Sequence, residues 1–398
     1  MNTMTSVERR ATASLAAVYG TRMAGFFFML PMFALFTEGL PGSTPVLAGL
    51  AVGIYGLMQA VLQIPLGMLS DHIGRKPVIM GGLLLFAIGS AIAALSDHIV
   101  WVIIGRAVQG CGAVAAAILA LAADLTRETQ RTKVMAGIGM TIGAAFILSL
   151  ILAPVAHAWV GASGIFWLTV GLAMIAIALV AWVVPTPPGR QIHRDVQPIP
   201  SMLRGVLRNP SLLRLDIGVF ILHLVLTTTF FALPVALRNL GMPLDTHAWI
   251  YLPLLVLSLL GMAPFIWLSS RKQSWAQPVF VGAVVVFGIA QAIMWQGTTT
   301  LWLLLIGVGL FFTAFNLLEA TLPAQVSKTA PPEAKGTALG VYTTSQFMGA
   351  FVGGVTGGWM YQSIELSAVF LLGTLAVYGW WLALRPLRSA GSAAKQVR

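Results

Sequence analysis

Twelve long apolar runs constrain the fold of this chain more than any other feature of its sequence. Each has about 20 predominantly apolar residues, the length that an α-helix needs to cross the hydrocarbon core of a bilayer. Only 9% of the 398 residues are charged, too few for a soluble domain or a disordered chain. We therefore expect an all-α polytopic membrane protein with transmembrane helices at about 13–36, 46–69, 78–96, 99–123, 134–158, 163–184, 212–238, 246–269, 277–296, 300–322, 336–361 and 364–385.

The segment between the sixth and seventh runs divides the twelve helices into two sets of six. It contains six prolines and four arginines, a composition that cannot form one continuous helix. We predict an N-terminal six-helix bundle over 1–184, a cytoplasmic linker over 185–211 and a C-terminal six-helix bundle over 212–398. Similar segments at 65–71 and 264–270 suggest that the bundles are pseudo-symmetric repeats, an arrangement typical of secondary transporters.

Most basic residues fall on one side of the predicted membrane. If both termini share a side, that side receives 20 of the 23 Lys and Arg residues, the opposite loops hold only Arg238, and Arg22 and Arg106 lie within helices. The positive-inside rule then places both termini and the central linker in the cytoplasm. We expect the protein to lie in the cell (inner) membrane. The net charge of +11 is thus a topology feature, so we expect the lipid bilayer and no nucleic acid as a partner. We also expect a monomer, since a fold of two such bundles works as one.

The most specific local motif is Gly67-Met68-Leu69-Ser70-Asp71-His72-Ile73-Gly74-Arg75-Lys76-Pro77. Gly67 permits close approach of helix backbones and Gly74 a tight turn. A basic turn between two helices would explain Arg75 and Lys76, but not Asp71 or the glycines. The motif resembles the G-x-L-x-D-x-x-G-R-K signature of the loop between helices 2 and 3 in the major facilitator superfamily (MFS).

This resemblance implies a gate at the cytoplasmic side. An acid at the end of the fourth helix, here Asp124, would pair with Arg75. Asp71 would face the beginning of the eleventh helix at Gly336, where a carboxylate is favoured by the helix dipole. Such a latch between the halves would hold the cytoplasmic side shut and favour an outward-open state.

The fourth helix carries Arg106-Ala107-Val108-Gln109-Gly110, which resembles the R-x-x-Q-G motif of proton-coupled antiporters in the superfamily. An arginine within a helix costs about 2.5–3.5 kcal/mol on insertion scales, so Arg106 should face a partner or a wet cavity. A structural ion pair, or a side chain that extends to the outer surface, are the alternatives. Overall the chain resembles proton-coupled drug antiporters, above all the YajR-like group, and we expect it to lack that group's extra C-terminal domain.

The fifth helix departs from the antiporter pattern. Antiporters of the superfamily usually carry G-x-x-x-G-P-x-x-G-G there, whereas residues 149–158 keep the proline and have lost the glycines. This loss keeps an importing symporter open as an alternative. Gly139 and Gly143, and the stripe of Gly349, Gly353 and Gly357, are expected to serve close helix packing.

Polar residues within the apolar runs are the candidates for proton and substrate handling. Glu319 is the clearest membrane carboxylate of the C-terminal half and could instead be an interface residue, and His223 could be a hydrogen-bonded buried histidine. The first helix has Arg22 and no acid before Glu38, which speaks against broad cation export. The full set comprises Arg22, Arg106, Gln109, Glu319, His223 and Asn316, with Tyr55, Gln59, Gln63, Gln291 and Gln346 as residues that could line a cavity.

Nucleotide-binding, metal-binding and nucleophile motifs are missing from the sequence, so we expect neither an enzyme nor a cofactor, and no metal site. The proton gradient is then the expected energy source. We predict a secondary transporter that works by alternating access, most simply proton-coupled efflux of a small hydrophobic or amphipathic compound. A proton symporter or facilitator that imports a metabolite is the first alternative, and a non-transporting membrane receptor or scaffold is the second.

Overall fold

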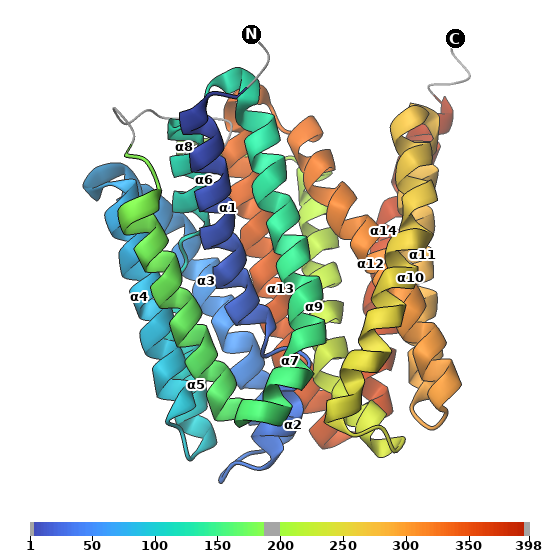
Figure 1. Cartoon of the computed structure of the whole chain (residues 1–398). Helices are drawn as coiled ribbons and strands as arrows, with labels where there is room; N and C mark the ends of the chain where they lie inside the picture. Colours follow the sequence, from blue (N-terminus) through green and yellow to red (C-terminus); the bar gives the residue numbers. More distant parts are fainter. Residues whose placement is uncertain (1–3, 187–199, 394–398) are drawn as a thin grey trace.

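The computed structural model describes residues 4–186 and 200–393, and all the regular structure in these ranges is helical. The first described helix begins, and the last one ends, on the same side of the molecule (Figure 1). We call this the termini side, and the other the opposite side. Of the predicted linker, residues 187–199 lie outside the described part of the chain.

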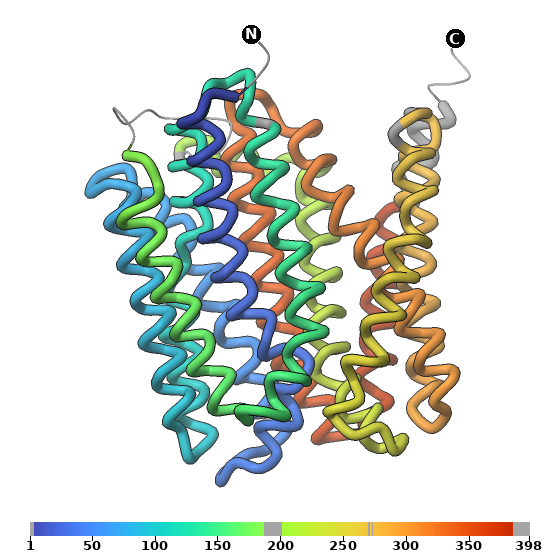
Figure 2. Tube along the Cα trace, in the orientation of Figure 1, coloured from blue at the N-terminus to red at the C-terminus, as the bar shows by residue number. Residues whose placement is uncertain are grey.

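The chain forms long helices that run between these two sides (Figures 1 and 2). The N-terminal half consists of α1 (Ser6–Phe27), α2 (Phe33–Glu38), α3 (Pro45–Ile73), α4 (Arg75–Ala94), α5 (Ile99–Cys111), α6 (Ala115–Asp124) and α7 (Glu128–Ala178), which ends in a π-turn (Leu179–Val183). The C-terminal half consists of α8 (Pro200–Leu207), α9 (Pro210–Asn239), α10 (His247–Arg271), α11 (Gln273–Gly297), α12 (Leu301–Thr329), α13 (Lys335–Ser363) and α14 (Leu366–Ala393), with short 3₁₀ turns at Leu244–Thr246 and Pro332–Ala334.

The twelve predicted transmembrane helices are confirmed, with different boundaries. Within the described residues, nine helical stretches are long and apolar enough to cross a membrane, and α7 counts once among them. It holds two spans, because Gly161 leaves helical geometry with a φ of 68° and lets the chain reverse. The other two spans are α1 and α13. The fourth span is built from α5 and α6, which are interrupted at residues 112–114.

Local sequence explains where several helices begin. The Thr5 hydroxyl accepts from the Glu8 backbone while the Glu8 carboxylate accepts from the Thr5 backbone, a capping box that starts α1 well before residue 13. Thr44 and Asn209 cap α3 and α9, each followed by a proline in the first turn. Gly74 ends α3 with a φ of 108°, a conformation that side chains rarely adopt.

Glycines bring the two halves into backbone contact. A β-carbon built on Gly49 of α3 would lie 2.2 Å from the Gly354 carbonyl oxygen of α13, and one on Gly358 would lie 2.2 Å from the Pro45 oxygen. On its other face α13 meets α9 through Gly349 and Gly353, whose β-carbons would lie 2.1 and 2.4 Å from backbone oxygens. The packing role expected for the stripe of Gly349, Gly353 and Gly357 is confirmed.

The same expectation is wrong for Gly139 and Gly143 of α7. A β-carbon on either would meet nothing within 4 Å. In this arrangement these glycines do not pack on another described helix, because the neighbouring contacts of α7 are made by other faces of the helix.

The halves also meet through polar contacts on the opposite side. Arg238 at the end of α9 pairs with Glu38 at the end of α2. The Val46 backbone donates to Gln362 Oε1 of α13 over 3.2 Å. The molecule is therefore closed on the opposite side, because α3 and α13 are in contact there. In Figure 1 the ribbons of α7 and α10 diverge toward the termini side.

Exposed tryptophans mark both edges of the apolar region, as amphipathic rings do at membrane–water interfaces. All of them are at least 46% exposed. On the opposite side they are Trp101, Trp159, Trp249, Trp302 and Trp359, and on the termini side Trp182, Trp267 and Trp275. A ninth exposed tryptophan, Trp167, lies further inside its span.

The Gly354→Ala variant tests the backbone contact between α3 and α13. Its added methyl group would lie 2.6 Å from the Gly49 oxygen and 2.8 Å from the Gly53 nitrogen, and such overpacking costs about 1–3 kcal/mol. We expect the unfolding temperature of the purified protein to fall by several degrees. The control Gly282→Ala, whose methyl group would meet nothing within 4 Å, should unfold like the wild type. Equal stability of both variants would contradict the contact.

Candidate functional site

On the termini side, Arg75 organises a cluster of polar side chains, the gate cluster. The Arg75 side chain is 3% exposed, and its Nε donates to Asp124 Oδ2 over 3.1 Å. Nη1 donates to Ser70 Oγ over 2.7 Å and also pairs with Asp71. The Arg75–Asp124 pair that the family resemblance implied is confirmed. Ser70 was not singled out from the sequence, although it lies within the same motif.

The surroundings of the gate cluster follow from its small residues. Gly74 turns the chain so that Arg75 begins α4. A β-carbon on Gly67 would lie 3.1 Å from the Ala116 side chain, so the predicted close approach at Gly67 is confirmed. Lys76 points elsewhere, since its Nζ donates to the Val184 carbonyl over 2.6 Å. Gly336 is buried in the first turn of α13.

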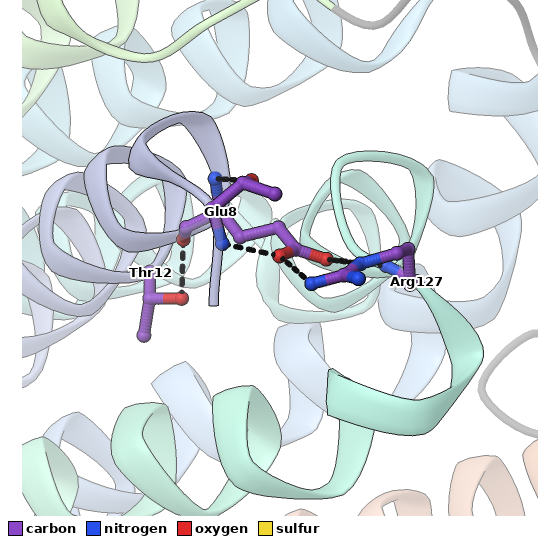
Figure 3. A network of polar contacts seen from close by, with 4 residues as sticks. Glu8, Thr12 and Arg127 are labelled. Carbon is purple, nitrogen blue, oxygen red and sulfur yellow. Dashed lines mark hydrogen bonds and ion pairs between the residues drawn. The ribbon is translucent and has the colours of Figure 1, made fainter. Parts of the chain in front are cut away.

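A second ion pair on the termini side ties α1 to the start of α7 (Figure 3). Glu8 Oε1 accepts from the Arg127 backbone over 3.0 Å and from its Nε over 2.8 Å, and Oε2 accepts from Nη2 over 2.8 Å. The Arg127 side chain holds the pKa of the Glu8 carboxyl well below its usual range. The sequence analysis did not single out this pair, although the T-x-x-E capping pattern at residues 5–8 was readable.

The Glu8→Gln variant should unfold at a lower temperature than the wild type at neutral pH, because it loses the charge that Arg127 binds. A carboxyl whose pKa is depressed in the folded protein stabilises the folded state at pH values above the ordinary pKa of glutamate, about 4.3. This stabilisation is lost as the pH falls through the pKa of the folded state. The difference in unfolding temperature should therefore shrink below about pH 4. Glu128→Gln, at an exposed carboxylate nearby, is the control, and a difference that grows in acid would refute the pairing.

Inside the N-terminal half, two predicted residues meet around Tyr55. Arg106 is 1% exposed, and its guanidinium carbon lies 4.9 Å from the Tyr55 ring centre and 5.5–5.6 Å from those of Phe33 and Phe26. Its Nε donates to the Ala51 oxygen over 3.3 Å, and it also pairs with Gln109. The Gln109 amide donates to Ser90 Oγ over 2.8 Å. Arg106 is thus held by rings and neutral oxygens, with no ion pair to a described carboxylate.

Arg22 approaches the same tyrosine from α1. Its Nη2 lies 3.2 Å from the Tyr55 hydroxyl and donates to the Gly112 oxygen over 3.3 Å. Gln59 donates to the Gly110 oxygen over 3.0 Å. The interruption between α5 and α6 leaves these carbonyls without their full helical partners, so they are available to the side chains. We name Arg22, Tyr55, Gln59, Arg106 and Gln109 the arginine cluster.

In the C-terminal half, the structure brings together three further candidates, the histidine–glutamate cluster. His223 Nε2 of α9 lies 3.7 Å from Glu319 Oε2 of α12 and 2.8 Å from Gln346 Nε2 of α13. His223 Nδ1 lies 3.2 Å from the Val219 carbonyl oxygen. The His223 side chain is 9% exposed and that of Glu319 is 38% exposed. Asp216, two turns before His223 on α9, is also buried.

The remaining candidates share no described hydrogen bond with either cluster. Asn316 donates to Ser258 Oγ of α10 over 3.2 Å. Gln291 is fully buried and donates to Thr229 Oγ1 over 3.0 Å, so it links helices within the C-terminal half. Gln63 is buried one turn beyond Gln59, and its Oε1 has no hydrogen-bond partner among the described residues.

The fold and the motifs have a match among known families. The sequence profile of the Major Facilitator Superfamily matches residues 13–354. The chain belongs to this superfamily. It is therefore a membrane transporter, and like other members it is not an enzyme.

Several relatives of this transporter match it over most of its length. It is 45% identical to the "Inner membrane transport protein YajR" of Escherichia coli K12 over 95% of this chain and 83% of that protein. It is 27% identical to "Multidrug resistance protein MdtH" of Proteus mirabilis over 88% of each chain. A solved bacterial homologue of the lysosomal transporter Spinster, in an inward-facing conformation, aligns with a TM-score of 0.76 at 12% identity, over 96% of this chain and 98% of that one, which shows the shared fold.

Proposed function

We propose that this transporter exchanges protons for a small hydrophobic or amphipathic compound that it exports, and that the histidine–glutamate cluster carries the proton. The observation that carries this proposal is the position of His223 Nε2, 3.7 Å from Glu319 Oε2. Both residues lie in the C-terminal half, whose helix α13 contacts α3 of the N-terminal half. Titratable groups within a membrane are costly, and they are typical of proton relays. The proton gradient is then the energy source.

The hydrogen bonds around His223 suggest how a proton would act. Because Nδ1 faces a carbonyl oxygen, that nitrogen carries the hydrogen, and Nε2 accepts from the Gln346 amide. A proton that binds Nε2 turns this nitrogen into a donor. The Gln346 amide can then no longer donate a hydrogen bond to it. The imidazolium would then attract the Glu319 carboxylate. Since Gln346 belongs to α13, the protonation state of His223 would bias the helix that joins the halves.

Alternating access would use the contacts between the halves, 1–184 and 212–398. In this account α3 and α13 close the opposite side with the Glu38–Arg238 pair, and the gate cluster with Gly336 acts at the termini side. We place the termini side in the cytoplasm because the basic residues gather there. We place the protein, as a monomer, in the inner membrane, in keeping with the name of its relative YajR.

The relatives favour efflux, since MdtH is named a multidrug resistance protein. The altered glycine motif of the fifth span is the feature that favours a symporter or facilitator instead. The two mechanisms differ in the direction in which protons move with substrate, so one experiment separates them.

Everted membrane vesicles test the proposal directly. Respiration acidifies their lumen and quenches a pH-sensitive acridine dye. Amphipathic compounds, among them cationic ethidium and anionic 1-naphthoate, are then added at the cytoplasmic face. An exported compound should release protons from the lumen and restore fluorescence, and Glu319→Gln should abolish this response because the carboxylate can no longer be charged.

The control Glu333→Gln removes an exposed carboxylate and should leave the response intact. Coupling by Glu319 is refuted if Glu319→Gln restores fluorescence as the wild type does. Efflux is refuted if a compound moves only from the lumen to the cytoplasmic face together with protons, which is the result for a symporter.

A further inference from the structure

Positive charge without a counter-charge distinguishes the interior of the N-terminal half. All of its acidic residues lie at helix ends or in turns, namely Glu8, Glu38, Asp71, Asp97, Asp124 and Glu128. Between these ends the half contains Arg22 and Arg106, which are 0% and 1% exposed. The described residues include no ion pair to either arginine. Two guanidinium groups therefore share one tyrosine with no anion to neutralise them.

Arg22 is the less satisfied of the two. Nη2 makes both of its hydrogen bonds, while Nε and Nη1 have no acceptor among the described residues. A buried charge that is neither paired nor hydrogen-bonded is strongly unfavourable. Arg106 has its hydrogen bonds and three aromatic rings around it, so it needs neutralisation less. The two free donors, Nε and Nη1, point to different edges of the guanidinium, so each can give a charge-assisted hydrogen bond to a carboxylate oxygen.

We propose that Arg22 binds the carboxylate of an aromatic, anionic substrate, next to Tyr55 in the arginine cluster. This inference rests on the proposed transport function and names the class of its substrate. The guanidinium of Arg22 neutralises the carboxylate, and Arg106 adds a second positive charge. Phe26, whose ring stacks on that of Tyr55 with centres 4.4 Å apart, supplies the apolar surface for the aromatic part.

The position of the site suits alternating access. Tyr55 is followed by Gly56, where a β-carbon would lie 2.7 Å from the Phe347 oxygen of α13. The site therefore lies directly beside the contact between the halves. Phe26 and Phe347 are both half-buried, so they border the site at this contact. Separation of α3 from α13 would open it, and their approach would enclose a bound anion away from water.

Thermal unfolding of the purified full-length protein with a matched pair of probes tests this site. The probes are 1-naphthoate and its neutral analogue 1-naphthamide, which differ chiefly in charge. We expect 1-naphthoate to raise the unfolding temperature of the wild type and 1-naphthamide to raise it much less. Arg22→Gln should weaken 1-naphthoate binding at least tenfold, whereas Arg22→Lys should keep part of it.

A second readout separates a binding role from a structural one. Because Arg22→Gln removes an uncompensated buried charge, the variant without ligand should unfold at the same temperature as the wild type or higher. A purely structural arginine would give a lower temperature. The control Arg9→Gln, at an exposed arginine near the start of the same helix, should bind 1-naphthoate like the wild type.

The anion site is refuted if 1-naphthoate fails to stabilise the wild type, if 1-naphthamide stabilises it equally, or if Arg22→Gln binds 1-naphthoate unchanged. The Glu319→Gln variant separates the test of the anion site from the test of proton coupling. It should still bind 1-naphthoate, because Glu319 lies in the other half. Binding by this variant together with proton exchange that does not depend on Glu319 would refute the proposed coupling and leave the anion site standing.

Discussion

A charge within a bilayer must be neutralised, hydrogen-bonded or hydrated, and this requirement shapes the interior of the transporter. Away from the ends of its helices, the chain separates its charges by sign. The N-terminal half holds Arg22 and Arg106 around Tyr55, and the C-terminal half holds Glu319 and Asp216 near His223. In our account the first half receives an anion and the second a proton. Neither half then needs an internal counter-ion of its own, because each ligand supplies the missing charge.

The glycine contacts between α3 and α13 let the two charged clusters be coupled to a movement of the halves. Since α3 and α13 touch through backbone atoms at Gly49 and Gly354, small changes in their crossing can part the halves without repacking large side chains. Both clusters adjoin this contact. Tyr55 lies on α3 next to Gly56, and Gln346 lies on α13 beside His223. A bound anion and a bound proton can therefore act on the same pair of helices from its two sides.

The sequence predicted much of this arrangement because apolar length and charge position are visible without a structure. Twelve spans follow from the runs of apolar residues. The Arg75–Asp124 pair was implied by the resemblance of the motif that carries Arg75 to the superfamily signature. The interruption of the fourth span at residues 112–114 was not predicted, because glycines within an apolar run can equally serve close helix packing. The approach of His223 to Glu319 could not be predicted either, since they lie on different helices and their distance depends on how α9 and α12 cross. Gly139 and Gly143 show that glycine spacing alone does not predict helix packing. Glycines four residues apart pack against other helices on α13, but on α7 they contact no other helix among the described residues.

The central claim is that protonation of the histidine–glutamate cluster controls which side of the transporter is closed, and a distance across the termini side measures this most directly. Spin labels are placed at Thr129 of α7 and Ser274 of α11, both exposed, in a Cys111→Ser background. Double electron–electron resonance in lipid nanodiscs then gives the distance distribution on either side of the ordinary pKa range of glutamate and histidine. We predict that the distribution shifts with pH in the wild type and stays fixed in Glu319→Gln. A distribution that ignores pH in the wild type, or shifts equally in the variant, would contradict the account.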